Sequence, residues 1–340
     1  MGMNILVVNA GSSSIKFALF GEEKTPIWSA EGQFDQLSNL PNLPIEVIGH
    51  RVVHGGEKFR KPTYLTKKVE EEIHELCYLA PLHNPICLNG IKQTRRLFPE
   101  ARHFAVFDTA FHAHIPDVAC TYALPLEWRE KGIRKYGFHG ISYAYIASQI
   151  ESEKCVVCHL GSGASLCALL NGKSIDTTMG FSPLDGLVMG TRCGALDPSV
   201  VIHLMMHEKL FPSKIEHLLN FESGLLGLSG ISADMRHIEE SQDHHARFAL
   251  ELFTYRFKQQ LGQMIAALDG LDTLVFTAGI GENSPTIRKR LLPSYLGIEL
   301  DEKANNKNAP LISTPNSKVK VEVIPTHEEW QIAKLCRENC

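Results

Sequence analysis

The chain has 340 residues, of which 44% are hydrophobic and 21% are charged, and its formal net charge is −4. This composition is typical of a globular protein with enough chain for two domains, and the charge pattern has no basic run that would favour nucleic acid as a partner. The longest apolar stretches are far shorter than the roughly 20 residues that cross a bilayer, and no signal peptide precedes the first apolar run, so we expect a cytoplasmic protein without a membrane partner.

The first half of the chain is predicted to run from strands into helices. Residues 4–53 are interpreted as strands separated by turns, with residues 21–26 as a hairpin connection. Apolar positions at helical spacing predict a helix over residues 67–80, and a proline at a first helical position predicts another over residues 85–98. A strand over residues 101–107 then leads into a polar loop that carries Asp108.

The second half of the chain restarts the same order. Strands are predicted at residues 155–160, 164–170 and 174–178, and a long helix at residues 247–268 ends before a glycine. A strand at 273–277, a polar loop at 305–316, a strand at 318–324 and a closing helix at 328–337 complete the pattern. Strands followed by helix–strand alternation, twice over, predict a duplicated α/β fold.

The cysteines and histidines give no metal signature. Nine cysteines are scattered without a framework, which fits a reducing compartment. Cys155 and Cys158 form a C-x-x-C, but they lie in an apolar strand, where residues three apart point to opposite faces, so we interpret them as packing residues. The sixteen histidines include no H-E-x-x-H spacing. The pairs at 112 and 114 and at 244 and 245 are predicted to be surface or loop residues.

Two Gly/Ser loops point to phosphate binding. Residues 9–14 (NAGSSS) and residues 161–163 (GSG) each lie between two apolar strands. Such a turn leaves backbone N–H groups and hydroxyls in one concavity, which suits an anion. Two such hairpins predict two lobes that close on a polyphosphate, as in a two-lobed kinase. The P-loop pattern is absent, and residues 278–283 (AGIGEN) lack the third glycine of a dinucleotide fingerprint, which argues against a dehydrogenase.

Ten segments, in the family's order from residue 4 to residue 330, closely resemble the acetate kinase family. They are NAGSSSIKF (9–17), GHRVVHGG (49–56), APLHNP (80–85), FDTAFH (107–112), YGFHG (136–140), HLG (159–161), TMGFSPL (178–184), GTR (190–192), AGIGEN (278–283) and PTHEE (325–329). The resemblance implies two duplicated lobes of the actin-like, ribonuclease H-like ATPase fold with the active site in the cleft between them. We expect residues 1–112 with 329–340 to form the acceptor and phosphate lobe, and residues 113–328 the nucleotide lobe.

The same resemblance implies a reaction. The γ-phosphoryl group of ATP would pass directly to acetate, with Mg²⁺ (or Mn²⁺) bound, giving acetyl phosphate and ADP, and the protein would be a homodimer. Such a transfer brings two anions together, so cationic groups are needed, and the guanidinium fork of Arg51 and of Arg192 matches carboxylate and phosphate oxygens. The resemblance makes His139 a donor to the phosphoryl group in flight. Acetate is already ionised at neutral pH, so Asp108 has no proton to remove and is expected to orient other groups and help hold Mg²⁺.

The resemblance also implies the binding residues. The methyl group of the acceptor would contact Val53, Leu82, Phe138 and Pro183. The nucleotide would contact Asn9, Ser12, Ser14, Lys16, His159, Gly161, Ser162, Gly163, Asp234, Met235, Arg236, Gly279, Ile280, Gly281 and Asn283. Asn9, Asp108 and Glu328 would hold the metal, since Mg²⁺ favours one or two carboxylates together with phosphate oxygens and water.

Two alternatives remain open on this sequence. Ser162, Ala195 and His327 stand where the family usually has Asn, Asp and Asn, and the chain is shorter than expected, most visibly between residues 20 and 48. These departures motivate a catalytically weakened nucleotide-binding homologue. Propionate is the rival acceptor, although Val53 favours acetate because a smaller residue there would make room for another carbon.

Overall fold

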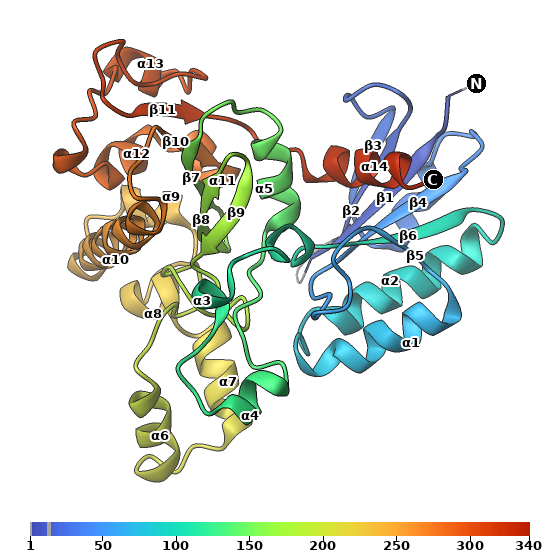
Figure 1. Cartoon of the computed structure of the whole chain (residues 1–340), viewed down its shortest axis with the longest axis horizontal. Coiled ribbons are helices and arrows are strands. Elements are labelled where there is room, and N and C mark those ends of the chain that lie inside the picture. The colour runs from blue at the N-terminus through green and yellow to red at the C-terminus, as the bar shows by residue number, and fades with distance from the viewer. Residues whose placement is uncertain (1, 12–14) are drawn as a thin grey trace.

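The computed structural model describes residues 2–11 and 15–340, and Figure 1 shows its two sheets side by side. The first sheet has the order β3-β2-β1-β4-β6-β5. Its strands are β1 (Ile5–Ala10), β2 (Ile15–Phe20), β3 (Trp28–Gly32), β4 (Val47–Val52), β5 (Thr63–Tyr64) and β6 (Arg102–Phe107). β1 is antiparallel to β2 and parallel to β4, which is parallel to β6.

The second sheet repeats this arrangement. It has the order β11-β10-β7-β8-β9, built from β7 (Lys154–Leu160), β8 (Ala164–Leu170), β9 (Lys173–Thr177), β10 (Thr273–Thr277) and β11 (Lys320–Val323). The first three strands form an antiparallel meander, and β7, β10 and β11 are parallel, as β1, β4 and β6 are. The predicted duplication is therefore confirmed.

Helices cover both faces of the first sheet. Ile5 and Val7 of β1 pack with Ile332 of α14 (Glu328–Glu338), whereas Leu6 and Val8 face the opposite side. α2 (Asn84–Leu97) contacts β1 and β4 and lies beside α1 (Lys67–Glu75). Burial on both faces explains why β1 is a continuous apolar run without alternation. The last helix of the chain thus returns to the first sheet (Figure 1).

The second sheet is covered in the same way. α10 (His244–Leu268) packs on β7, β8 and β9, and α5 (Gly140–Ala147) contacts β7. Cys158 belongs to the core on the α10 side and Cys155 to the core on the α5 side, and both are free thiols. The interpretation of the C-x-x-C as strand packing is therefore confirmed.

Shorter elements fill the connections. These are α3 (Asp117–Cys120), α4 (Leu126–Glu130), α6 (Pro198–Met206), α7 (Pro212–Phe221), α8 (Gly224–Ser229), α9 (Met235–Glu240), α11 (Ala278–Asn283), α12 (Pro285–Leu291) and α13 (Glu302–Asn306), with 3-10 turns η1 (Phe34–Asn39), η2 (Leu76–Tyr78), η3 (Ala110–His112) and η4 (Ser294–Leu296). Within residues 2–11 and 15–340, none of the helices has the length and apolar character that a membrane crossing requires.

Two predictions are wrong. The segment 305–316 is not all loop, because it begins in α13, which Asp301 caps, and Leu311 forms a β-bridge with Glu322. His112 is neither a surface nor a loop residue: it lies in η3, is 2% exposed, and its ring contacts Ser174 Oγ at 2.8 Å and the Phe138 carbonyl oxygen at 2.9 Å. Its burial comes from distant segments that fold over it, which the local sequence does not report.

Candidate active site

A buried ion pair lies where the parallel strands of the first sheet end. Arg51 is in β4 and Asp108 directly follows the neighbouring strand β6. Arg51 Nε donates to Asp108 Oδ1 at 3.0 Å, and Nη2 donates to Oδ2 at 2.6 Å, with the two side chains 18% and 2% exposed. Arg51 Nη1 also donates to Asn9 Oδ1, at 3.2 Å. The guanidinium is therefore held in one orientation by β1 and the end of β6 together.

The electrostatics of this pair follow from its burial. Burial raises the pKa of the Asp108 carboxyl, and the Arg51 guanidinium opposes that shift. For Arg51, burial alone would lower the pKa, but the charge and hydrogen bonds of Asp108 outweigh it and raise the pKa. Arg51 is thus a permanent cation whose charge Asp108 partly balances.

The start of α14 adds two carboxylates beside this pair. Glu329 Oε1 accepts a hydrogen bond from Asn9 Nδ2 at 2.9 Å, and Glu328 Oε2 lies 3.4 Å from the same nitrogen. The connection into α14 is fixed from the second sheet, because Glu282 Oε1 accepts from the backbone N–H groups of Thr326 and Ala278. Residues from both sheets therefore converge at one point.

Two stacked imidazoles face this point from the second sheet. The rings of His139 and His159 are 4.1 Å apart with an interplanar angle of 19°. His139 precedes α5 with a left-handed φ of 57°, and its Nδ1 lies 2.8 Å from Ser165 Oγ. Burial and then the His159 charge lower the pKa of His139 well below its usual value, and burial lowers that of His159 to about 4. Both rings are neutral at pH 7.

Arg192 supplies a second guanidinium, which is half-buried and has no acidic partner among the described residues. Its Nη1 donates to the Pro183 carbonyl oxygen at 2.6 Å, and no acidic side chain within residues 2–11 and 15–340 pairs with it. Burial and the Arg51 charge lower its pKa to about 10. A Cβ atom at Gly163 would lie 2.5 Å from Arg192 Nη2 and 3.2 Å from His139 Nε2. The Arg192 and His139 side chains thus converge beside the backbone of Gly163, where no side chain separates them from the main chain.

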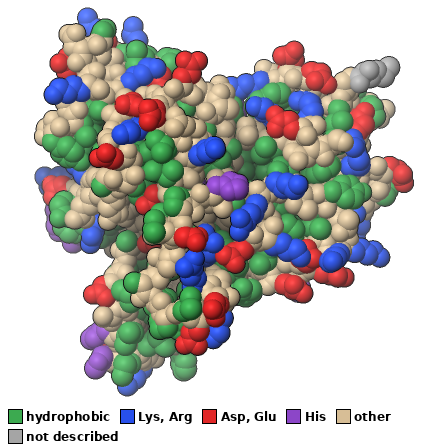
Figure 2. Space-filling view, viewed as in Figure 1, with side chains coloured by type: hydrophobic (Ala, Val, Ile, Leu, Met, Phe, Trp, Pro, Cys, Tyr) green, Lys and Arg blue, Asp and Glu red, His purple; other side chains and the backbone are tan. Residues whose placement is uncertain are grey.

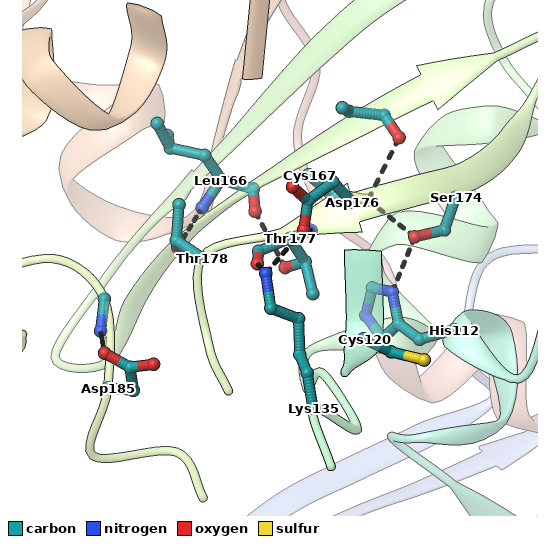
Figure 3. Close-up of polar contacts among 12 residues, drawn as sticks. His112, Cys120, Lys135, Leu166, Cys167, Ser174, Asp176, Thr177, Thr178 and Asp185 are labelled. Atoms are coloured by element: carbon teal, nitrogen blue, oxygen red, sulfur yellow. Dashed lines mark hydrogen bonds and ion pairs between the residues drawn. The ribbon is translucent and has the colours of Figure 1, made fainter. Parts of the chain in front are cut away.

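The chain at the end of β9, which leads toward Pro183, is held to the edge of the second sheet through Asp176 and Thr178 (Figure 3). Lys135 Nζ donates to Asp176 Oδ1 at 2.6 Å, and Thr178 Oγ1 accepts from the backbone N–H of Leu166 at 3.0 Å. These contacts fix the chain where it leaves β9, five residues before Pro183.

A pocket of about 890 Å³ opens next to these groups. Eight of the residues predicted to bind the nucleotide line it, and these are Gly161, Ser162, Asp234, Met235, Arg236, Gly279, Ile280 and Asn283. Asp234 caps α9 and pairs with Arg236 at 2.5 Å, and this ion pair stands at the pocket wall. The pocket is also lined by residues that were not assigned to the nucleotide, namely Gly190, Thr191, Ala233, Glu239, Glu240, Ser284, Pro285 and Thr286.

Four other predicted nucleotide residues lie away from this pocket or outside the description. Lys16 lines a separate pocket between β2, β3 and the start of α14. Gly281 is buried in α11 and faces Phe276 and β7. Ser12 and Ser14 fall outside the described residues. The nucleotide roles of these four, like those of the residues that line the pocket, stay predictions.

The residues predicted for the acceptor fall into two pairs. Val53 and Phe138 are buried, 4% and 1% exposed, whereas Leu82 and Pro183 line an apolar pocket of about 500 Å³. His83 lines the same pocket, and burial together with the charges of Arg192 and Arg51 lowers its pKa to about 4. The apolar pocket therefore lies within electrostatic reach of both guanidinium groups.

Sequence reasoning missed the polar groups that support this site. Ser142 and Tyr143 on α5, Ser165 on β8 and Thr326 before α14 are all within hydrogen-bond distance of one another or of the histidines. Nothing in a buried strand or helix marks such hydroxyls in advance. Glu329 is different, because it lies in the PTHEE segment, yet only its neighbour was assigned a role.

Comparison with known proteins identifies the family. The model described as the acetokinase family matches residues 34–334. The chain belongs to the acetokinase family. It is 50% identical, over 390 aligned residues and 98% of both chains, to the acetate kinase of Protochlamydia amoebophila. That alignment is longer than the 340 residues of this acetokinase, so the relative has segments that this chain lacks.

Solved structures agree with this assignment. A propionate kinase from Francisella tularensis is 37% identical with a TM-score of 0.90 over 98% of both chains. An acetate kinase from Entamoeba histolytica is 33% identical with a TM-score of 0.91, over 98% of this chain and 99% of the other. The predicted fold is therefore confirmed: this acetokinase has the duplicated actin-like ATPase fold.

Proposed function

We propose that this protein is an acetate kinase, which transfers the γ-phosphoryl group of ATP to acetate and releases acetyl phosphate and ADP. The observation that carries the proposal is the half-buried Arg192 guanidinium, which has no acidic partner among the described residues and lies beside the balanced Arg51–Asp108 pair. A partly desolvated cation without a counterion is a site for an anion, and the fork geometry suits carboxylate and phosphoryl oxygens. Matches to acetate kinases along the whole chain support the same reaction.

The chemistry then assigns a role to each group. A carboxylate oxygen of acetate attacks the γ-phosphorus in line, the bond from phosphorus to the β-bridging oxygen breaks, and that electron pair leaves on ADP. Arg51 and Arg192 hold the acceptor and balance charge on the phosphoryl oxygens, and neutral His139 donates to them. No proton leaves acetate, so Asp108 acts by orienting Arg51.

The binding residues are proposed on the same basis. ATP would lie in the 890 Å³ pocket, with its phosphates directed toward the His139–His159 stack and the loop at residues 161–163. The acyl group would lie toward Leu82 and Pro183. We propose that residues 1–112 with 329–340 and residues 113–328 act as two lobes that close over both substrates and exclude water.

The oxygen groups beside Arg51 fit a Mg²⁺ ion. Among the described residues no cluster of three or more acidic, histidine or cysteine side chains forms a complete metal cage. Mg²⁺ does not need one, because it keeps waters and shares phosphate oxygens with the nucleotide. Glu328 and Asn9 would hold it, with Asp108 close by but already bound to Arg51. When bound, the ion neutralises charge on the phosphate oxygens; Mn²⁺ would fit the same donors.

Two further properties are proposed. A homodimer is supported by the apolar side chains that α6 and the start of α7 expose (Figure 2), including Ile202, Met206 and Phe211 at 55%, 61% and 78% exposure. A cytoplasmic location is supported by the nine cysteines, all of which are free thiols.

The test is a hydroxamate trap assay with ATP and Mg²⁺, offering acetate, propionate and butyrate at equal concentrations. Acyl hydroxamate that forms with the wild-type protein and is lost in Arg192→Ala supports the proposal. Propionate is the second candidate acceptor, because an apolar pocket of about 500 Å³ adjoins Leu82 and Pro183, and the assay ranks the acids directly. Binding of ATP without any acyl product would refute the kinase and favour a nucleotide-binding homologue.

A further inference from the structure

The two stacked histidines are each bound at Nδ1 by a serine from the opposite structural element. His139 at the start of α5 contacts Ser165 Oγ of β8 at 2.8 Å, and His159 of β7 contacts Ser142 Oγ of α5 at 2.9 Å. His159 and Ser165 are direct partners in the β7–β8 register, so they lie on the same face of the sheet, toward α5. Each serine–histidine hydrogen bond therefore joins the α5 segment to the β7–β8 hairpin, and together the two bonds fix both rings.

On the His139 side the chain of hydrogen bonds continues to a tyrosine. The Tyr143 hydroxyl lies 2.5 Å from Ser165 Oγ, and Tyr143 is completely buried, at 0% exposure. A phenol is a stronger hydrogen-bond donor and a weaker acceptor than an alcohol, so the Tyr143 hydroxyl donates to Ser165. The single Ser165 proton is then free to be donated to His139 Nδ1. Burial raises the pKa of Tyr143 well above its usual value, so the phenol keeps its proton.

We propose that Tyr143 and Ser165 are positioning residues that hold His139 in the tautomer whose proton is on Nε2. A neutral imidazole has one N–H group, so a ring that accepts at Nδ1 must donate at Nε2. His139 Nε2 and the Arg192 guanidinium both lie close to Gly163. The relay of hydrogen bonds from Tyr143 through Ser165 to His139 thus supplies a fixed, neutral donor at the place where the phosphoryl group would pass. This assignment of roles rests on the proposed phosphoryl transfer; the tautomer itself does not.

The test measures the tautomer and turnover separately. Long-range ¹⁵N–¹H correlation spectra of the full chain labelled at histidine distinguish protonated from unprotonated ring nitrogens, and His139→Gln identifies the His139 signals by their loss. In the wild-type protein we expect the proton on Nε2. In Ser165→Ala we expect a mixture of the two tautomers, because the donor to Nδ1 has been removed.

Kinetics provide the second measurement. Ser165→Ala should lower kcat about 10- to 100-fold, as loss of an orienting partner commonly does, and Tyr143→Phe should lower it about 2- to 10-fold. The affinity for ADP should stay the same, which also shows that both variants are folded. Tyr145→Phe is the matched control, because it removes another buried tyrosine hydroxyl from α5, one that contacts Lys24 instead of the relay.

The outcomes are separable from the proposed function. A wild-type spectrum with the proton on Nδ1 would overturn the relay, and so would Ser165→Ala and Tyr143→Phe proteins that keep the wild-type tautomer and kcat. A wild-type protein that makes no acyl phosphate would instead refute the kinase, and the spectrum would still decide the tautomer.

Discussion

Replacing Arg192 should stabilise the protein and abolish its activity. The guanidinium is half-buried and has no acidic partner among the described residues, and desolvation together with the Arg51 charge lowers its pKa from 12.5 to about 10. One pKa unit corresponds to about 1.4 kcal/mol, so the buried charge costs about 3 kcal/mol relative to the unfolded chain. The side chain is only partly shielded from solvent, which reduces this to about 1–3 kcal/mol.

The sign of this effect at pH 7 is clear. A cation whose folded pKa is lowered destabilises the folded state at every pH below that pKa, and the penalty disappears only as the pH rises through about 10 toward the unfolded value of 12.5. The Arg192→Met variant is therefore free of the penalty at pH 7. It leaves the Pro183 carbonyl oxygen without its donor, which costs about 1 kcal/mol. The net expectation is a gain of up to about 2 kcal/mol in the free energy of unfolding.

Two assays test this pair of opposite effects. Equilibrium urea unfolding without ligand measures the stability, and the hydroxamate assay should show a loss in kcat of about 10³-fold or more, as for other arginines that stabilise phosphoryl transfer. Arg192→Lys is the control, because it keeps the buried charge and should not gain stability. A Met variant that is clearly less stable than wild type would refute the reasoning, since it would mean that Arg192 has a stabilising partner in the folded protein.

Three further expectations follow from the same geometry. Asp108→Asn should lower the free energy of unfolding by about 3 kcal/mol, measured by urea titration, because it leaves buried Arg51 unpaired; unchanged stability would contradict the ion pair. Burial lowers the pKa of His112 from 6.5 to about 4, so the stability that neutral His112 contributes is present above pH 6.5 and lost as the pH falls toward 4. His112→Gln should therefore flatten the decline in the free energy of unfolding between pH 7 and pH 5, measured by urea titrations at pH 7, 6 and 5. An unaltered decline would count against the role of His112. Gly163→Ala should lower kcat at least about tenfold, because the new Cβ would push Arg192 and His139 out of position, and small misplacements of this kind impair catalysis. Gly262→Ala on α10 is the control, because the new Cβ has room there and kcat should not change. Equal activities of the two variants would exclude the steric argument.

Much of the fold could be predicted because its helices and strands depend on sequence patterns that extend over only a few residues. The strand at residues 273–277 was predicted with its observed bounds, and α2 was predicted to within one residue at either end, because apolar runs and the proline at its start are local signals. The repeated order of strands and helices predicted the duplication for the same reason. In the segment 305–316, the bridge of Leu311 to Glu322 depends on a partner outside the segment, whereas the cap at Asp301 is a local signal that the prediction overlooked.

The site residues likewise differ in whether local sequence or tertiary contacts identify them. The glycine-flanked arginines, the histidine before α5 and the two Gly/Ser loops could be singled out from the sequence, since each lies in a recognisable segment. What could not be predicted is which charges balance: Arg51 pairs with Asp108 from 57 residues away, whereas Arg192 has no such partner in the part of the chain that the structure describes. The crossed pairing of His139 and His159 with serines likewise joins segments 26 and 17 residues apart.

The sequence by itself therefore determined the order of the elements, the duplication and the types of residue available for chemistry, because periodicity and turn residues act over a few positions. Only the tertiary structure decided which polar groups are buried, which are paired and which nitrogen of an imidazole faces the site. Those properties arise where β4, β6, α5 and the β7–β8 hairpin meet, and desolvation and hydrogen bonding act there between residues that are remote in the chain.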